Sequence, residues 1–354
     1  MLVLGIETSC DETSAAVVED GRRILSNVVA SQHEVHRPYG GIVPELASRA
    51  HLGKIGPIVD RALADAGLSL DDVHAVAVTQ GPGLIGSLLV GVSFAKALAF
   101  AKNLPLVAVD HLEGHIRAAY LESEEPIPHP ALSLVVSGGH TSLFLMSEED
   151  SYELIGKTRD DAAGEAYDKV AKRLGLGYPG GPVLDRLAAL GDPSVYRFSV
   201  PRFSDGSEDF SFSGLKSAVL RKIVETPVDP VAEGDDPTTR QDVCDLAAGF
   251  QRTVIECLVR RSETAAKRLH ARAILVSGGV AANSELRTTF AALGLDLGIP
   301  VVLPRVSLST DNAAMIAAAG YAKVSRNELS SMDLSADVEL HLGEPLERRT
   351  TRYR

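Results

Sequence analysis

The sequence has no tryptophan, only three cysteines and no excess of positive charge among its 354 residues. Cys10, Cys244 and Cys257 are far apart and odd in number, which argues against a disulfide framework or a cysteine metal finger and is typical of a reducing compartment. The formal net charge of −12 argues against a chain that attracts nucleic acid over its whole surface. Any such contact must use local basic patches or a partner.

Long hydrophobic runs are also missing. No unbroken apolar run reaches the roughly 18 residues of a membrane span, and the opening MLVLGIETSC lacks the basic stretch of an export signal. We therefore expect a cytoplasmic protein without membrane attachment. A length of 354 residues is enough for two hydrophobic cores, so we expect two domains.

Two segments concentrate positive charge, RRSETAAKRLHAR and the tail LERRTTRYR. Their basic residues are Arg260, Arg261, Lys267, Arg268 and Arg272 in the first, and Arg348, Arg349, Arg352 and Arg354 in the second. For each segment taken alone, a solvated helix face or a frayed tail is a simpler interpretation than a nucleic-acid site.

The stretch VDHLEGHIRAAY places His111 and His115 four residues apart at the start of a predicted helix. This spacing puts both imidazoles on one helix face, where they can bind one metal ion. The zinc-protease pattern H-E-x-x-H needs its general base directly after the first histidine, and that position is Leu112. Glu113 is rotated about 100° further around the helix. The pattern therefore disfavours a metallopeptidase, and two surface histidines remain the alternative to a metal site.

Two parts of the chain begin in the same way, with a strand, a small-residue turn and a second strand. A gap-free alignment matches Ser9 with Ser137, Thr13 with Thr141 and Ser14 with Ser142, with apolar runs on either side. We therefore predict an α/β fold with two duplicated lobes and a central cleft, as in the ribonuclease-H-like lobes of actin-like ATPases (the ASKHA fold). Chance similarity between two short hairpins is the alternative.

The domain boundaries follow from this duplication. We expect an N-terminal lobe at 1–125, completed by a C-terminal helix at 311–330, a C-terminal lobe at 126–310 and a tail at 331–354. The acidic, proline-rich stretch ESEEPIPHP is the expected linker. The segment TPVDPVAEGDDPTT at 226–239 is predicted to be a disordered surface loop.

Polar turns follow several predicted strands or open predicted helices. They are GIETSCDET, HLEGH, VSGGHT, SGGVAAN and STDNAA. Turns of Gly, Ser and Thr bring backbone N–H groups and hydroxyls close to phosphate oxygens, and α/β folds place ligand sites at the ends of strands. Together the turns predict a phosphate and metal site, with Asp311 as the third ligand beside His111 and His115. For each motif alone, a structural turn or an N-terminal helix residue is the alternative.

The ordered motifs resemble one known family. They are GIETSCDETSAAVV, YGGIVPELASRAH, QGPGLIGSLLVG, HLEGH, VSGGHTSL, AAGEAYDKVAKRLGLGYPGGP, FSFSGLKSAV, SGGVAANSELR and STDNAAMIA. Over nearly the entire chain they resemble the TsaD family of tRNA adenosine threonylcarbamoyltransferases, formerly called O-sialoglycoprotein endopeptidases. The resemblance implies transfer of a threonylcarbamoyl group from threonylcarbamoyl-AMP to the N6 amine of the adenosine 3′ of the anticodon, in tRNAs that read codons starting with A.

The resemblance also implies a set of site residues. One divalent metal per subunit, Fe²⁺ favoured with Zn²⁺ as the alternative, is expected on His111, His115 and Asp311, and Asp11 is a further metal or phosphate contact. The expected substrate-binding residues are Val136, Ser137, Gly138, Gly139, His140, Asp168, Gly181, Asp185 and Asn283. For Asp168, Asp185 and Asn283, helix capping and turn stabilisation are the alternative roles. No general base can be named from the sequence.

The implied partners are tRNA, a TsaB-type paralogue and a TsaE-type ATPase. Three other functions stay open at this point. They are a metallopeptidase, a carbamoyltransferase with a small-molecule acceptor, and a non-catalytic nucleotide-binding protein that could lose the histidine pair and still work.

Overall fold

The computed structural model describes residues 1–122, 125–201, 203, 205–226, 228–232 and 234–343. The part of the predicted tail from residue 344 on, with its basic residues Arg348, Arg349, Arg352 and Arg354, lies outside these described residues. The chain divides into two compact units. Unit 1 contains Met1–Ile127 and resumes at Pro304, and unit 2 contains Pro128–Leu303.

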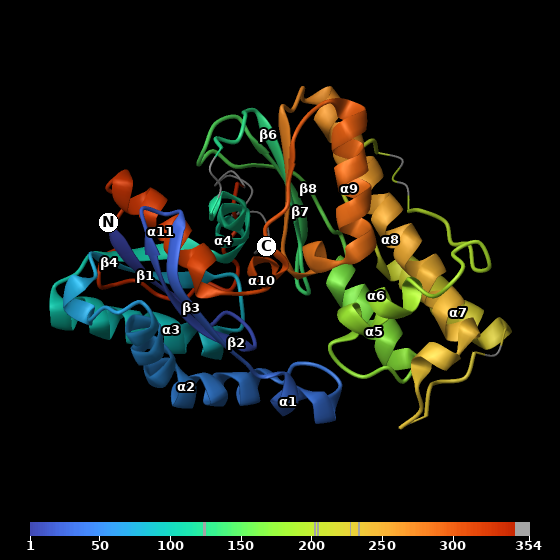
Figure 1. The fold of residues 1–354 in the computed structure, drawn as a ribbon, viewed down its shortest axis with the longest axis horizontal. Coiled ribbons are helices and arrows are strands. Elements are labelled where there is room, and N and C mark those ends of the chain that lie inside the picture. The colour runs from blue at the N-terminus through green and yellow to red at the C-terminus, as the bar shows by residue number, and fades with distance from the viewer. Residues whose placement is uncertain (123–124, 202, 204, 227, 233, 344–354) are drawn as a thin grey trace, which may run out of the picture. The chain divides into compact units, whose positions relative to one another are not determined.

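In its described residues, unit 1 has a mixed five-stranded sheet in the order β3-β2-β1-β4-β5 (Figure 1). The strands are β1 (Leu2–Glu7), β2 (Glu12–Glu19), β3 (Arg23–Ser31), β4 (Ala75–Gly81) and β5 (Leu106–Asp110). Strands β1, β2 and β3 pair antiparallel, whereas β1, β4 and β5 run parallel. The carboxyl ends of β1, β4 and β5 therefore meet at one edge of the sheet, the position that α/β folds use for ligand sites.

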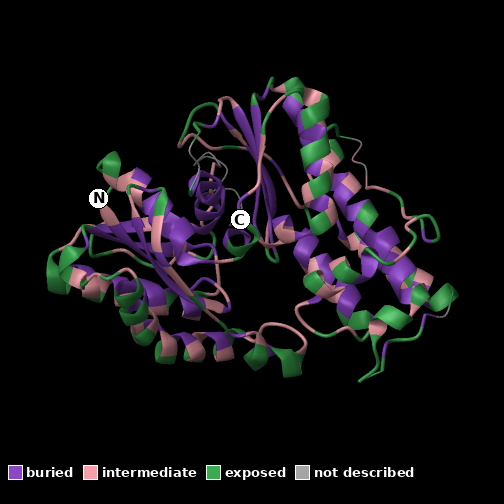
Figure 2. Cartoon of the chain, viewed as in Figure 1, coloured by how far each residue is buried: buried purple, intermediate pink, exposed green. Residues whose placement is uncertain are grey.

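Helices cover both faces of this sheet. Helices α2 (Pro44–Asp65) and α3 (Ile85–Lys102) pack on one face, and α11 (Ala313–Ser325) packs on the other (Figure 1). Because successive strand residues point to opposite faces, Val3 packs with the α11 side and Leu4 with the α2 and α3 side. Strands β1, β2, β4 and β5 are accordingly buried nearly throughout, whereas the edge strand β3 is mostly half-buried or exposed (Figure 2).

Three short helices complete unit 1. They are α1 (His33–His36), α4 (His111–Arg117) and α10 (Val306–Ser309). Both α1 and α4 directly follow strands, α4 without any intervening residue. This junction places the first histidine of HLEGH at the edge of the sheet.

Helix α3 is long and apolar enough to cross a membrane by length and composition alone. In unit 1 it packs on β4 and α2 and buries Leu88, Val92 and Ala95. It is therefore a partly buried core helix of unit 1.

Unit 2 repeats the same plan, with the sheet order β10-β9-β6-β7-β8 among its described residues. Its strands are β6 (Ala131–Val136), β7 (Thr141–Met146), β8 (Glu153–Lys157), β9 (Ala273–Ser277) and β10 (Val301–Val302). Its helices are α5 (Ala163–Arg173), α6 (Gly180–Ala188), α7 (Ser213–Glu225), α8 (Gln241–Arg268) and α9 (Ser284–Leu297). They share one large core with β6, β7 and β9.

The register of the strands confirms the predicted duplication. Glu7 pairs with Ser14 in the β1–β2 hairpin, and Val135 pairs with Ser142 in the β6–β7 hairpin. These are the partners that the gap-free sequence alignment matches. The likeness therefore extends along whole hairpins and is not limited to shared turn residues.

One expectation about unit 2 is wrong. The segment at 226–239, predicted to be a disordered surface loop, buries Val228 and Val231 in the core of unit 2. The amide of Val231 also donates to the carbonyl of Leu174 at 2.8 Å. The acidic and proline-rich composition hid these two apolar anchors, which hold the segment on unit 2.

Candidate functional site

The candidate metal centre lies in unit 1, where β5 ends. Asp110 is the last residue of β5 and caps α4, since its carboxylate accepts the amide of Leu112 at 2.8 Å. This cap fixes His111 and His115 on one face of α4. Asp311 comes from the loop before α11, the helix that packs against α4.

The three side chains converge on one point. A ligand atom from each of His111, His115 and Asp311 lies within 4.8 Å of the others. Asp311 Oδ1 is 3.1 Å from His115 Nε2 and 3.5 Å from His111 Nε2, and the two imidazole rings meet edge to face with centroids 4.7 Å apart. Two imidazoles and one carboxylate are a donor set that suits iron or zinc.

Glu7 stands behind this group and orients one of its histidines. Its Oε2 is 3.2 Å from His111 Nδ1 and also accepts the hydroxyl of Thr79 at 2.6 Å. Burial alone would raise the pKa of Glu7, but the attraction of His111 outweighs burial and the pKa is lowered. An ionised Glu7 that accepts from Nδ1 turns Nε2 of His111 toward Asp311 and the candidate metal position, which is the usual arrangement behind a metal-bound histidine.

The pKa values of the two histidines are shifted in opposite directions. Burial acts to lower the pKa of His111, yet the carboxylates of Asp311 and Glu7 together raise it to about 9. Burial lowers the pKa of His115 and keeps this imidazole in the neutral form that binds metals.

His115 provides the test of whether a metal fits. The residue is fully buried, its Nδ1 has no hydrogen-bond partner among the described residues, and its Nε2 lies 3.1 Å from Asp311 Oδ1. Burial of an imidazole with so few partners costs free energy, which a metal ion bound between Nε2 and the carboxylate would offset. The donor set and this buried imidazole both fit a divalent metal.

Glu113, the central residue of HLEGH, lies outside the metal group. Its Oε2 is 3.1 Å from Lys323 Nζ on α11, and Lys323 also donates to the carbonyl of Ala108 at 3.2 Å. The buried Glu113 carboxylate thus ties α4 to α11. It is not a base over a metal-bound water, in agreement with the disfavoured peptidase pattern.

A second group of candidate ligands lies at the β1–β2 turn of unit 1. Asp11 joins Glu12 and His33 there, with Glu12 Oε1 3.4 Å from His33 Nε2. Burial and the neighbouring carboxylates of Asp11 and Asp311 raise the pKa of Glu12 to about 8, although the contact with His33 opposes this shift. Asp11 is therefore placed near the metal centre without being part of it.

The expected phosphate-binding turn of unit 2 follows Val136, the last residue of β6. The amide of Ser137 donates to the carbonyl of His140 at 2.8 Å, which closes the turn around Gly138 and Gly139. A side chain added at either glycine would meet nothing within 4 Å, so both backbone faces are open. At the first turn of α5, Gly164 donates to the carbonyl of Ser137 at 3.1 Å. The loop after β9 lies beside this turn, because Val135 pairs in parallel with Ser277.

The other predicted substrate residues of unit 2 join its helices. Asp168 on α5 accepts the amide of Gly180 at 2.8 Å, directly before Gly181 in α6. Asp185 on α6 accepts the amide of Ser284 at 3.0 Å, and Asn283 caps α9 by accepting the amide of Leu286 at 2.9 Å. The alternative role of these residues, capping of helices and turns, is thus present in the fold.

Sequence reasoning missed Gln251, a polar residue on the buried face of α8. Its amide donates to Asp185 at 3.1 Å and accepts from Asn283 Nδ2 at 2.6 Å. Gln251 is 1% exposed. A polar residue at a core position of an amphipathic helix was the available signal, and so was Glu7 at the end of an apolar strand.

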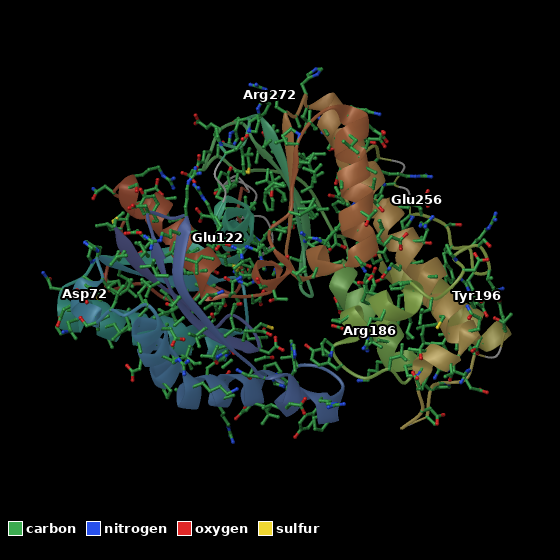
Figure 3. All side chains as sticks on the ribbon, viewed as in Figure 1. Asp72, Glu122, Arg186, Tyr196, Glu256 and Arg272 are labelled. Carbon is green, nitrogen blue, oxygen red and sulfur yellow. The ribbon has the colours of Figure 1, made fainter. Side chains whose placement is uncertain are left out.

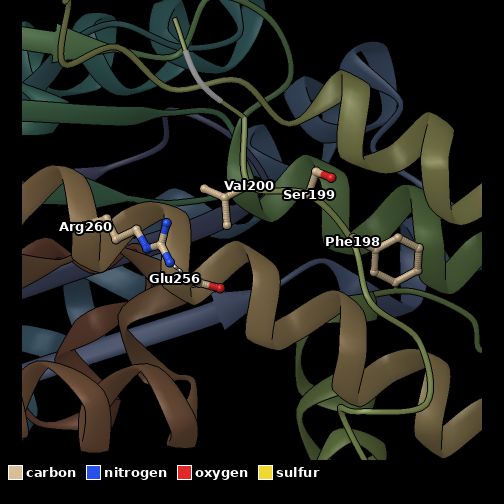
Figure 4. Close-up of a pocket in the computed structure, with 5 residues that line it drawn as sticks. All are labelled: Phe198, Ser199, Val200, Glu256 and Arg260. Carbon is tan, nitrogen blue, oxygen red and sulfur yellow. Dashed lines mark ion pairs between the residues drawn. The ribbon is translucent and has the colours of Figure 1, made fainter.

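Most of the basic residues predicted as a patch on and after α8 have partners within unit 2. Arg260 pairs with Glu256, Lys267 with Glu263 and Arg268 with Glu208. Arg261 and Arg272 donate to the carbonyls of Ser207 and His129, and Glu256 and Arg272 are labelled in Figure 3. This pairing favours the simpler interpretation, a solvated helix face. Glu256 and Arg260 also line a hollow of about 450 Å³ with Phe198, Ser199 and Val200 (Figure 4), and none of the predicted site residues is among them.

Solved structures agree with the duplicated fold. The chain aligns with HypF from T. kodakarensis at a TM-score of 0.60 and 14% identity, over 94% of this chain and 49% of that one. It aligns with component A of (R)-2-hydroxyglutaryl-CoA dehydratase from Acidaminococcus fermentans at a TM-score of 0.52 and 17% identity, over 92% and 99% of the two chains. The fold and the histidine pair together define a candidate metal-binding protein of the actin-like ATPase fold.

Sequence comparison narrows this class to one family. Residues 23–318 match the sequence profile described as "TsaD: tRNA N6-adenosine threonylcarbamoyltransferase". A tRNA N6-adenosine threonylcarbamoyltransferase from Koribacter versatilis is 51% identical over 96% of this chain and 99% of its own length. Another from Caldicellulosiruptor bescii is 52% identical over 94% and 95% of the two chains. The chain belongs to the TsaD family and is a threonylcarbamoyltransferase that acts on tRNA.

Proposed function

We propose that this chain transfers a threonylcarbamoyl group from threonylcarbamoyl-AMP to the N6 amine of the adenosine 3′ of the anticodon, in tRNAs that read codons starting with A. The observation that carries this proposal is the His111–His115–Asp311 group, with both histidines buried, within a chain of the TsaD family. In the reaction, N6 bonds to the carbamoyl carbon while the bond from that carbon to the phosphate oxygen of AMP breaks. The mixed anhydride is already activated, so no protein nucleophile is required.

The proposed metal ligands are His111, His115 and Asp311, with Fe²⁺ favoured and Zn²⁺ as the alternative. A divalent ion held there would supply positive charge toward the phosphate of the leaving AMP. Glu7 supports this role because it fixes the His111 imidazole from behind at 3.2 Å. Metal analysis of protein purified without added metal or a nickel-affinity step would identify the ion.

In unit 2, we assign substrate binding to Val136–His140 and to the helix junctions marked by Asp168, Gly181, Asp185 and Asn283. The open space around Gly138 and Gly139 supports contact with an anionic oxygen, since no protein atom lies within 4 Å of a Cβ placed at either residue. The carboxylates and the amide would hold hydroxyl groups of the ribose or the threonyl moiety. Gln251 would position Asp185 and Asn283 through its two hydrogen bonds.

A partner surface is supported by α3. Its exposed residues Ile85, Leu89 and Phe100 follow helical spacing along one stripe and are 52%, 48% and 78% exposed. Leu52 on α2, which packs against α3, is 68% exposed. We assign this apolar surface to a TsaB-type paralogue and expect a TsaE-type ATPase in the same assembly. Replacement of Phe100 by Glu should abolish capture of the paralogue, while Glu34→Gln on α1 should leave it unchanged.

The transfer itself is tested with purified components. The chain, its two partners, threonylcarbamoyl-AMP and tRNA should yield threonylcarbamoyladenosine in digested tRNA. A tRNA with guanosine in place of the target adenosine is the matched control and should stay unmodified. Transfer to small amines with none to tRNA would instead support a small-molecule carbamoyltransferase. A cytoplasmic location without membrane attachment follows from the tRNA substrate and is checked by cell fractionation.

A further inference from the structure

A second cluster of metal-ligand atoms lies in unit 1, apart from the histidine pair. Asp11, Glu12 and His33 each place one ligand atom within 4.8 Å of the others. His33 Nε2 is 3.4 Å from Glu12 Oε1 and 4.0 Å from Asp11 Oδ2. Two carboxylates and one imidazole therefore converge where β2 begins and α1 follows β3.

An ion pair with His33 does not account for the burial of the Asp11 carboxylate. Its side chain is 8% exposed, and its Oδ2 has no hydrogen-bond partner among the described residues. A buried carboxylate oxygen without a donor is costly, all the more beside a second carboxylate. A cation between the two carboxylates would remove both costs.

The turn that carries these carboxylates is held by a buried network. The imidazole of His51 on α2 contacts the carbonyl of Cys10 at 2.9 Å and the hydroxyl of Thr13 at 2.8 Å. The backbone N–H of Gln32, the residue before His33, donates to the carbonyl of Asp11 at 3.0 Å. This bond joins the end of β3 to the turn. The backbone that carries Asp11 and Glu12 is thus held in place by its surroundings.

We propose that Asp11, Glu12 and His33 bind a second divalent cation, of the oxygen-preferring class of Mn²⁺ and Mg²⁺. Two carboxylates and one imidazole form a harder donor set than the two imidazoles of the first group, so the two groups select different metals. Water or the anionic oxygens of a ligand complete the coordination sphere. Ser9, on the same turn, lies 3.3 Å from His111 Nδ1 and links this site to the first.

The test uses the full chain with its first group filled by one equivalent of Zn²⁺, which Mn²⁺ does not displace from such a site. Titration with Mn²⁺, followed by electron paramagnetic resonance, should show one bound Mn²⁺ per zinc-loaded chain. Glu12→Gln and Asp11→Asn should each weaken Mn²⁺ binding at least tenfold while zinc stays stoichiometric. Glu34→Gln, an exposed carboxylate on the same α1 helix, should bind Mn²⁺ like the unchanged chain.

Retained zinc and an unchanged circular dichroism spectrum report that the variants fold. His33→Gln, at a ligand position that is 43% exposed, serves as a third variant if Asp11→Asn does not fold. The proposal is overturned if the zinc-loaded chain binds no Mn²⁺, or if Glu12→Gln binds it as tightly as the unchanged chain. Because transfer to tRNA is not measured, either result leaves the proposed function untouched.

Discussion

Unit 1 and unit 2 share one strand order, but the turns after their first strands carry different chemistry. In the gap-free alignment Glu7 matches Val135, Asp11 matches Gly139 and Glu12 matches His140. Unit 1 thus gathers carboxylates and imidazoles, whereas unit 2 exposes glycine backbone. The same scaffold carries charged side chains in one copy and exposed glycines in the other, because a hairpin fixes the backbone and its turn residues can change.

The largest expected effect is that of His115→Ala, which removes a metal ligand that unit 2 does not have. Loss of a buried metal ligand in unit 1 should lower bound metal and tRNA transfer at least about a hundredfold, beyond the 10- to 100-fold typical of outer residues. Metal analysis and a single-turnover transfer assay measure both. His74→Asn, an exposed histidine position of unit 1, is the control and should keep metal and activity. Full transfer by metal-free His115→Ala would show that the reaction does not require the metal.

Glu7→Gln tests the residue for which unit 2 has only a valine. Glutamine has the size of glutamate but no charge, so its hydrogen bond to His111 Nδ1 should be weaker. We therefore expect the metal affinity to fall about 10- to 100-fold. Competition with a chelator measures this change, and circular dichroism reports the fold. Unchanged affinity would show that Glu7 has a structural role only.

Gly138→Ala tests the turn of unit 2. The added methyl group meets no protein atom within 4 Å, so the fold should tolerate it. A ligand on the same backbone would clash, and the KM for threonylcarbamoyl-AMP should rise roughly tenfold, about 1.4 kcal/mol. Metal content should not change.

Gly164→Ala is the contrasting variant of this turn. Its Cβ would lie 2.6 Å from the carbonyl oxygen of Ser137, so we expect a loss of stability of about 1–3 kcal/mol by overpacking. The thermal unfolding temperature should fall for Gly164→Ala and stay unchanged for Gly138→Ala. If Gly138→Ala left the KM unchanged, the turn would not bind the donor.

Glu113→Gln should have the smallest effect on transfer, less than about twofold, because Glu113 faces Lys323 and not the metal ligands. It should instead lower the free energy of unfolding by about 1–3 kcal/mol, since the buried contact with Lys323 loses its charge. Denaturant unfolding and the transfer assay measure the two effects. A loss of activity as large as that of His115→Ala would restore a catalytic role for Glu113.

Much of the fold could be predicted from local patterns. Apolar runs bounded by Gly-rich turns placed β5 before His111 and α3 after the Gly/Pro turn, and three matched residues were enough to detect the duplication. These features depend on residues close together in the chain, where period and spacing carry the signal. The convergence of His111, His115 and Asp311 could be predicted from the polar turns at the ends of strands, and the family resemblance implied the same three residues.

The parts that escaped prediction are long-range pairs of side chains. Glu7 meets His111 across 104 residues, and Gln251 meets Asp185 across 66. No periodic pattern encodes such contacts, because packing of distant elements brings them together. The burial of Val228 and Val231 also escaped prediction, because the polar composition of their segment masked these two apolar residues.

We propose that the histidine pair and Asp311 of unit 1 hold the metal of this transferase. Anomalous X-ray diffraction from crystals of the full chain, at the absorption edge of the metal found by analysis, tests it most directly. We expect a peak about 2.0–2.3 Å from His111 Nε2, His115 Nε2 and a carboxylate oxygen of Asp311. A stoichiometric metal whose peak lies away from these three residues would contradict it.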